Sequence, residues 1–281
     1  MSLIRSAQRT TLVVRMVLVV VFALFSSAGL SAPVFDHSYA EWNALLSRHV
    51  HWTRDGAASE VNYDGFVRDR DVLKHALQEF SGVSRSDFEA WSKPQRRAFL
   101  INAYNAFTID LVLTKYPDLD SIKNLGTVWT SPWRRGFFDL FGETTSLDDI
   151  EQRFLRGAPD FDDPRIHFAL NCASIGCPAL RPEAYVADQL GSQLDDQARR
   201  FLADSSRNRL DSTTGTLHLS KIFQWYAPDF GKGFLNAWSV QQFLARYGDA
   251  LHASATDVDK LRRNEFTVTY GEYNWALNSA R

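Results

Sequence analysis

Apolar residues recur at helical spacing through much of the chain. Residues 39–50 place one tryptophan, two leucines and one valine on a common face, which predicts a helix. The same periodicity predicts further helices over residues 67–80, 188–203 and 239–247. A serine followed three positions later by an acidic residue marks helix starts at Ser86 and Ser146, and the second of these helices is predicted to end near Arg156.

Alternation of apolar and polar residues marks the strands. It predicts strands over residues 165–170, 216–220 and 266–270, with a short extended segment at residues 61–63. Helices outnumber strands, and the strands come late and scattered, which favours an α+β fold over a doubly wound parallel sheet. We expect a helix-rich single domain over residues 33–281, with a small, mostly antiparallel sheet packed on a buried central helix.

The central helix is predicted over residues 93–116. From residue 99 onward it is apolar nearly all round, as is typical of a buried helix. Asn102, Asn105 and Thr108 interrupt it at three-residue spacing and therefore share a face. A buried amide is costly unless it is hydrogen-bonded. The two asparagines are expected either to bond irregular loop backbone or to line a functional site, and both roles are compatible.

Both cysteines of the chain, Cys172 and Cys177, follow the predicted strand over residues 165–170, which also carries His167. A straight strand would place His167 roughly 16 Å from Cys172. A catalytic base must lie within hydrogen-bond reach of its nucleophile. His167 can therefore act on Cys172 only if the chain turns back near Asn171.

Three states of the two sulfurs are open from the sequence. An oxidising compartment and an even number of cysteines favour a disulfide. The nearby His167 favours a reactive thiol. A metal site would have two sulfurs and one imidazole but no Cys-x-x-Cys pair, so no metal or other cofactor is predicted. The spacing also speaks against redox exchange, since redox cysteines usually have two residues between them.

The N-terminal pattern indicates the compartment. Three arginines precede an apolar run of 10 residues over positions 16–25 and then a stretch of small residues, which predicts a secretory signal over residues 1–32. A membrane span needs about 20 apolar residues, so this run is expected to be a cleaved signal rather than a retained anchor. No later segment is apolar enough to span a bilayer, so no stable membrane insertion is expected after signal removal. The mature chain is expected to be periplasmic or secreted.

Charge excludes one class of partner. The formal net charge is −2, whereas binding to nucleic acid phosphates needs a concentrated basic face, so no nucleic acid partner is expected. His218 lies on the polar side of the predicted strand over residues 216–220. It is expected either to face solvent or to reach the cysteine turn through strand pairing.

Several ordered motifs resemble the domain-of-unknown-function 547 family, found in bacterial envelope proteins and in larger plant and animal proteins. The motifs are residues 98–106, residues 146–151 with Arg156, residues 164–174 with Cys177 and Pro178, residues 219–226 with Asp229 and Phe230, and residues 273–278. The resemblance as a whole extends over about residues 61–278 of the chain. Members commonly carry a histidine where this chain has Gln152, so a reaction that uses that histidine would be lost here.

The resemblance implies proximity rather than a particular reaction. It places eight side chains in one region, namely Asn102, Tyr104, Asn105, Glu151, Arg156, His167, Trp225 and Asn278. Of these, Tyr104, Glu151, Arg156, Trp225 and Asn278, together with His218, are candidate binding residues.

One function that fits these residues is a thiol-dependent hydrolase or acyl-transferase acting on an envelope peptide or amide. Cys172 would be the nucleophile, with Cys177 as its substitute. His167 or His218 would be the base. Asn102 or Asn105 would be the orienting or oxyanion-binding amide.

The alternative is a non-catalytic ligand-binding, peptide-binding or scaffold domain. A Cys172–Cys177 disulfide would then pin a loop over a groove for a small molecule or peptide. Aromatic walls with a few convergent polar groups suit such ligands, and the candidate walls are Tyr104, Trp225, Tyr273 and Trp275. Plain core packing is the competing explanation for these aromatic residues.

Overall fold

The computed structural model describes residues 35–127 and 130–280. The predicted secretory signal over residues 1–32 lies outside the described residues and stays a prediction. Residues from Phe35 onward belong to one compact unit. No helix among the described residues combines the length and hydrophobicity that a bilayer span requires.

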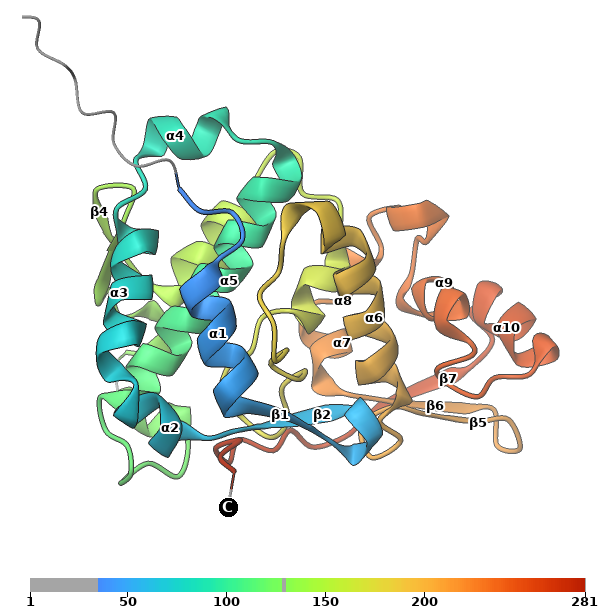
Figure 1. The fold of residues 1–281 in the computed structure, drawn as a ribbon. Helices are drawn as coiled ribbons and strands as arrows, with labels where there is room; N and C mark the ends of the chain where they lie inside the picture. The colour runs from blue at the N-terminus through green and yellow to red at the C-terminus, as the bar shows by residue number, and fades with distance from the viewer. Residues whose placement is uncertain (1–34, 128–129, 281) are drawn as a thin grey trace, which may run out of the picture. The chain divides into compact units, whose positions relative to one another are not determined.

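The first half of the described chain is mostly helical (Figure 1). Its α-helices are α1 (Ala40–His49), α2 (Tyr63–Arg68), α3 (Arg70–Ser81), α4 (Arg85–Ala90) and α5 (Lys93–Leu113). The helix predicted over residues 67–80 is thus two helices that meet at Asp69. Ser84, two positions before the predicted Ser86, caps α4 by accepting a hydrogen bond from the N–H of Asp87.

Helix α5 is the predicted buried central helix, and it is buried along almost all of residues 98–112. A capping box between Ser92 and Gln95 begins it. Helices α2 and α3 pack against it. Phe107 stacks on Phe138 of strand β3 (Phe138–Leu140), with ring centroids 3.8 Å apart. The helix is therefore fixed on several sides, so the polar side chains that interrupt it have fixed positions.

The strands are short and form three small sheets. Strands β1 (Val50–Thr53) and β2 (Ala58–Val61) form an antiparallel pair, as do β3 (Phe138–Leu140) and β4 (Glu143–Thr145). The third sheet has the order β5 (Arg209–Asp211), β6 (Thr216–Leu219), β7 (Thr267–Tyr270). Strand β6 pairs antiparallel with β5 and parallel with β7. The α+β prediction is confirmed, with the strands divided among sheets rather than gathered in one.

The second half of the chain has its own core. Its α-helices are α6 (Leu190–Ala203), α7 (Lys221–Trp225), α8 (Ala227–Phe230), α9 (Val240–Leu244) and α10 (Ala255–Arg262). These helices lie over one face of the three-stranded sheet (Figure 1). Phe168 brings the cysteine-bearing segment into this core, since its ring lies 5.2 Å from Phe201 and 5.7 Å from Phe223 between centroids.

Short helical turns connect these elements. The 3₁₀ turns are η1 (Arg54–Gly56), η2 (Ile122–Leu125), η3 (Pro132–Arg134), η5 (Pro164–Phe168), η6 (Ala187–Gln189), η7 (Phe234–Asn236) and η8 (Ala245–Tyr247), and η4 (Asp149–Leu155) is a π-helix. The predicted cap at Ser146 is present, because Ser146 and Asp149 exchange hydrogen bonds between side chain and backbone.

The strand predicted over residues 165–170 is wrong, because residues 164–168 form the 3₁₀ turn η5. Pro164 begins the turn, where its fixed φ suits a helical start and its missing N–H is not needed. The carboxylate of Asp163 accepts a hydrogen bond from the N–H of Arg165, which caps the turn. The apolar alternation reflects burial on two sides, and no neighbouring strand pairs with this segment among the described residues.

Candidate functional site

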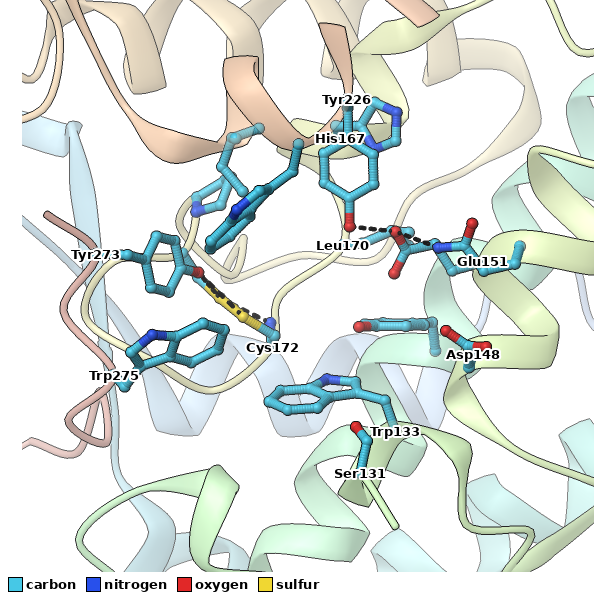
Figure 2. Close-up of a pocket in the computed structure, with 16 residues that line it drawn as sticks. Ser131, Trp133, Asp148, Glu151, His167, Leu170, Cys172, Tyr226, Tyr273 and Trp275 are labelled. Atoms are coloured by element: carbon cyan, nitrogen blue, oxygen red, sulfur yellow. Dashed lines mark hydrogen bonds between the residues drawn. A yellow bond between two sulfur atoms is a disulfide. The ribbon is translucent and has the colours of Figure 1, made fainter. Parts of the chain in front are cut away.

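A pocket with a cavity volume of about 250 Å³ lies where α5, η4, the cysteine-bearing segment, α7 and the C-terminal segment meet (Figure 2). Its lining comprises Tyr104, Ser131, Trp133, Asp148, Glu151, Gln152, His167, Leu170, Cys172, Cys177, Pro178, Ile222, Trp225, Tyr226, Tyr273 and Trp275. Six candidate residues from the sequence are therefore together in one lining, namely Tyr104, Glu151, His167, Cys172, Cys177 and Trp225.

The two cysteines form a disulfide whose Cα atoms lie 6.1 Å apart, and it closes a tight turn over residues 171–178. Asn171 braces the base of this turn. Its amide donates a 2.8 Å hydrogen bond to the carbonyl of Pro178 and accepts one of 2.9 Å from the N–H of Ala173. The chain thus does turn back after Asn171, and it joins the two sulfurs to each other.

The turn is also fixed from outside. Arg207 donates 2.6 Å hydrogen bonds to the carbonyls of Ile175 and Cys177, and its own charge is paired with Asp204 at 3.0 Å. Gly176 lies against the C-terminal segment, where an added Cβ would be 2.9 Å from the carbonyl oxygen of Asn274. A side chain at Gly176 would separate the turn from the segment that carries two pocket aromatic residues.

The buried asparagines of α5 hold loop backbone. Asn105 donates a 3.0 Å hydrogen bond to the carbonyl of Ala169 and accepts one of 2.9 Å from the N–H of Asn171. Asn102 makes the same pair of bonds with the backbone of Tyr185, at 2.7 and 3.0 Å. Neither amide is among the pocket-lining residues. Asn105 therefore positions the cysteine turn from behind.

Aromatic rings form one wall of the pocket. The ring of Tyr273 lies 4.5 Å from that of Trp275 and 4.9 Å from that of Trp225, and Trp133 lies 5.8 Å from Trp275, all between centroids. Trp225 is 43% exposed, which core packing does not explain. These four rings are called the aromatic wall below.

The disulfide adjoins this wall (Figure 2). The hydroxyl of Tyr273 lies 3.2 Å from the sulfur of Cys172 and 3.1 Å from that of Cys177. Burial raises the pKa of Tyr273 to about 12, so the hydroxyl keeps its proton at neutral pH and can donate to either sulfur. The wall and the disulfide are therefore one connected surface.

The opposite side of the pocket carries carboxyl groups. Figure 2 shows Glu151 and Asp148 across the pocket from Tyr273 and Trp275. The hydroxyl of Tyr226 donates a 2.6 Å hydrogen bond to Glu151. Burial raises the pKa of the Glu151 carboxyl, although this hydrogen bond and the charge of Arg156 oppose the shift. Gln152 donates a hydrogen bond to Glu151 and accepts one from Arg156.

His167 belongs to a buried polar cluster rather than to a thiol–imidazole pair. Its Nε2 lies 2.9 Å from Oδ2 of Asp229. The same oxygen binds Arg156 at 2.5 Å, and Oδ1 of Asp229 binds Lys232 at 2.9 Å. Because a carboxylate only accepts hydrogen bonds, Nε2 of His167 carries the proton. The imidazole stacks on Tyr226 at 3.8 Å, and its side chain is only 1% exposed. In this environment the imidazole of His167 has little access to a proton on a substrate.

The same cluster shifts two pKa values downward. Burial lowers the pKa of His167, although the hydrogen bond and charge of Asp229 oppose that shift. Burial alone would raise the pKa of Asp229, but hydrogen bonds from His167, Arg156 and Lys232 outweigh it and hold this pKa well below its usual value. Asp229 is therefore ionised and His167 neutral at pH 7.

Three other candidate residues lie outside the pocket lining. His218 bonds the hydroxyl of Thr269 at 2.8 Å across β6 and β7. Asn278 accepts a 2.7 Å hydrogen bond from Tyr63 behind the cysteine turn. Arg156 acts through Asp229 and Gln152. His218 is thus a sheet residue, whereas Asn278 and Arg156 support neighbours of the pocket.

Sequence reasoning did not assign a site role to five residues that build the pocket or its supports, namely Trp133, Asp148, Arg207, Tyr226 and Asp229. Asp148, Tyr226 and Asp229 belong to the family motifs, so these three had a local signal. Arg207 and Trp133 reach the site by chain folding alone, and no spacing pattern marks them.

Metal-ligating side chains come together elsewhere. Among the described residues, Glu41, His75 and Glu79 are the group whose ligand atoms lie close enough to hold an ion. Their arrangement is already accounted for by a 2.6 Å hydrogen bond between His75 and Glu41 on the surface. The cysteine turn offers no comparable group, since its sulfurs are bonded to each other.

Comparison with known proteins gives one match. Residues 88–202 match the family model described as a protein of unknown function, DUF547, which confirms the resemblance seen in the motifs. The matched segment contains α5, η4 and the cysteine turn, and therefore most of the residues that line the pocket. No curated protein and no solved structure matches the chain.

Proposed function

We propose that this chain, a DUF547 protein over residues 88–202, is a binding domain that holds a small ligand or one side chain of a peptide in the pocket between the aromatic wall and Glu151. The observation that carries the proposal is the exposed Trp225 beside a disulfide-pinned turn. A large ring left 43% exposed at a concave, partly polar site is typical of a surface that a ligand covers.

The size of the pocket limits the ligand. Ligand sites in proteins usually measure about 300–1,000 Å³, and this cavity of about 250 Å³ is at the small end. It accommodates a small molecule or a single projecting group. A peptide would therefore bind through one anchoring side chain rather than along its length.

The rigidity of the pocket supports binding. The disulfide, Arg207 and Asn105 fix the turn through bonds to its backbone. A wall that is already ordered loses little conformational entropy when a ligand arrives, which increases affinity for a given contact area. The same bonds leave the sulfurs without the freedom that a nucleophile needs.

A fragment panel tests the proposed function. Neutral aromatic, cationic and anionic fragments and short peptide amides are added to ¹⁵N-labelled protein, and the indole N–H signals of Trp133, Trp225 and Trp275 are followed by NMR. At least one class is expected to shift them. Trp225→Ala is expected to weaken that binding at least tenfold, because exposed tryptophans in pockets dominate binding energy.

Trp238 provides the matched control, since it is 68% exposed but does not line the pocket. Trp238→Ala is expected to leave the affinity unchanged. A panel in which no fragment moves the three pocket indoles would overturn the binding function. Equal losses in the two tryptophan variants would also count against this pocket.

A thiol-dependent hydrolase or acyl-transferase is the second candidate, because both sulfurs line the pocket and the Tyr273 hydroxyl lies within 3.2 Å of each. An external dithiol would first have to reduce the disulfide and free Cys172. The burial of His167 and its bond to Asp229 leave that thiol without an accessible imidazole base.

Alkylation separates the two functions. Without reductant, iodoacetamide is expected to label neither Cys172 nor Cys177 in the folded protein, because both sulfurs are in the disulfide. After reduction and a second treatment with iodoacetamide, mass spectrometry should show both cysteines labelled. Ester or amide hydrolysis that appears on reduction and disappears in Cys172→Ala would instead favour the enzyme.

A further inference from the structure

The pocket is lined by acidic side chains and by no lysine or arginine among the described residues. Asp148 and Glu151 contribute the carboxyl groups. His167 lines the pocket as a neutral group, since burial lowers its pKa. Asp148 has an exposed partner in Arg134 at 3.8 Å. Glu151 has no ion-pair partner within 4.0 Å among the described residues, because Arg156 binds Asp229.

The rings of the pocket present faces that attract cations. Two of them already hold cations of the chain itself: Lys123 lies 5.0 Å from the centroid of Trp275, and Arg156 lies 5.1 Å from that of Tyr226. The pocket rings of Trp133, Trp225 and Tyr273 have no cation of the described chain over them, and Trp225 is 43% exposed at the pocket.

The two halves of the pocket complement each other. A cation over a tryptophan or tyrosine ring is attracted by the negative face of the ring, most strongly when water is excluded. A buried carboxyl without a counter-charge is costly to ionise, and a cation placed opposite it removes part of that cost. An anionic or strongly polar neutral ligand would meet Glu151 and apolar ring faces without either gain.

From this arrangement we propose that the pocket recognises an alkylammonium group, which the aromatic wall encloses while Glu151 and Asp148 face its charge. The ligand class is a trimethylammonium compound or a primary amine on an alkyl chain. Because the site is the same pocket, the ammonium specificity rests on the proposed binding function.

The test uses two probes of the same shape. Choline carries a trimethylammonium group, and 3,3-dimethyl-1-butanol replaces it with a neutral tert-butyl group. Affinities of the whole folded chain for each are measured by NMR titration of the pocket indole signals. Choline is expected to bind at least tenfold more tightly, and Glu151→Gln is expected to reduce choline affinity about tenfold while leaving that of the alcohol unchanged.

The pH dependence gives a second readout. The groups that face Glu151 are Gln152 of η4 and its flanking residues Asp148 and Arg156, Tyr104 of α5, Asp229 of α8 and its N-cap Tyr226, and Tyr273. A bound cation favours the ionised carboxylate, so choline affinity is expected to rise as the pH increases through the raised pKa of Glu151. The affinity for the alcohol should stay constant.

The outcomes distinguish the ammonium specificity from the binding function. Equal affinities for the two probes, or choline binding unchanged in Glu151→Gln, would overturn the specificity and leave a ligand pocket. If no fragment class shifts the pocket indole signals, both the ammonium specificity and the binding function are overturned. Glu89→Gln, a change at an exposed carboxylate outside the pocket, is the control for general charge effects and should leave choline binding unchanged. If Glu151→Gln fails to fold, the comparison of the two probes on the wild-type protein still decides.

Discussion

Replacing Asn105 with leucine is expected to lower the free energy of unfolding by about 2–5 kcal/mol. The leucine fills a similar space but leaves the carbonyl of Ala169 and the N–H of Asn171 without their buried partner. Each unsatisfied buried backbone group costs about 1–3 kcal/mol. Urea denaturation followed by circular dichroism measures the loss.

Thr108→Val is the matched control for this change. Thr108 is on the same face of α5 and is equally buried, but its hydroxyl bonds only the carbonyl of Tyr104 within its own helix. Its replacement is expected to cost less than about 1 kcal/mol. Similar losses in the two variants would show that Asn105 is an ordinary core residue and does not hold the cysteine turn.

The asparagines show what local pattern can and cannot predict. Their placement in an apolar helix predicts buried, hydrogen-bonded amides, and that prediction is confirmed by the bonds of Asn102 and Asn105 to loop backbone. The backbone partners of these amides lie far along the chain: Ala169 is 64 positions from Asn105, and Tyr185 is 83 positions from Asn102. No spacing rule within a helix contains that information.

Helix α5 and the turn η5 mark the two extremes of fold prediction. Helix α5 has 21 residues, a capping box and continuous apolar character, so local signals agree with its burial. The segment 165–170 alternates like a strand, yet Pro164 and Asp163 initiate a 3₁₀ turn and no partner strand exists beside it in the described chain. Alternation predicts a strand only where a neighbour completes the hydrogen bonds.

The pocket was partly predictable because its chemistry is concentrated in short motifs. Cys172 and Cys177 were identified from their residue type and spacing, whereas Glu151 and Trp225 were identified through the family resemblance, and all four line one cavity. The hydrogen-bond partner of His167 was not predicted. The sulfur of Cys172 lies five positions away in sequence, whereas the observed partner, the carboxylate of Asp229, lies 62 positions away. Proximity in sequence suggested the Cys172 thiol as the partner of His167, but in the folded chain His167 binds the carboxylate of Asp229.

Replacing Asp229 with alanine is expected to lower the free energy of unfolding by about 3–5 kcal/mol, as is typical when one member of a buried charge cluster is removed. Asp229 is the shared acceptor of His167, Arg156 and Lys232, and its side chain is 1% exposed. The exposed i,i+3 pair of Arg262 with Asp259 offers the contrast. Asp259→Ala is expected to cost less than about 1 kcal/mol.

The pH dependence of this loss follows from the direction of the Asp229 shift. The folded-state pKa of Asp229 lies below its unfolded value of about 3.9, so the folded protein binds fewer protons there and the ionised carboxylate stabilises it. That contribution is fully present above about pH 4 and is lost as the pH falls through the folded pKa. Urea titrations at pH 7, 5 and 3 should therefore show the gap between wild type and Asp229→Ala persisting to about pH 4 and narrowing only below it. A gap that closes between pH 7 and 5 would mean that another group, and not the Asp229 carboxylate, stabilises the cluster.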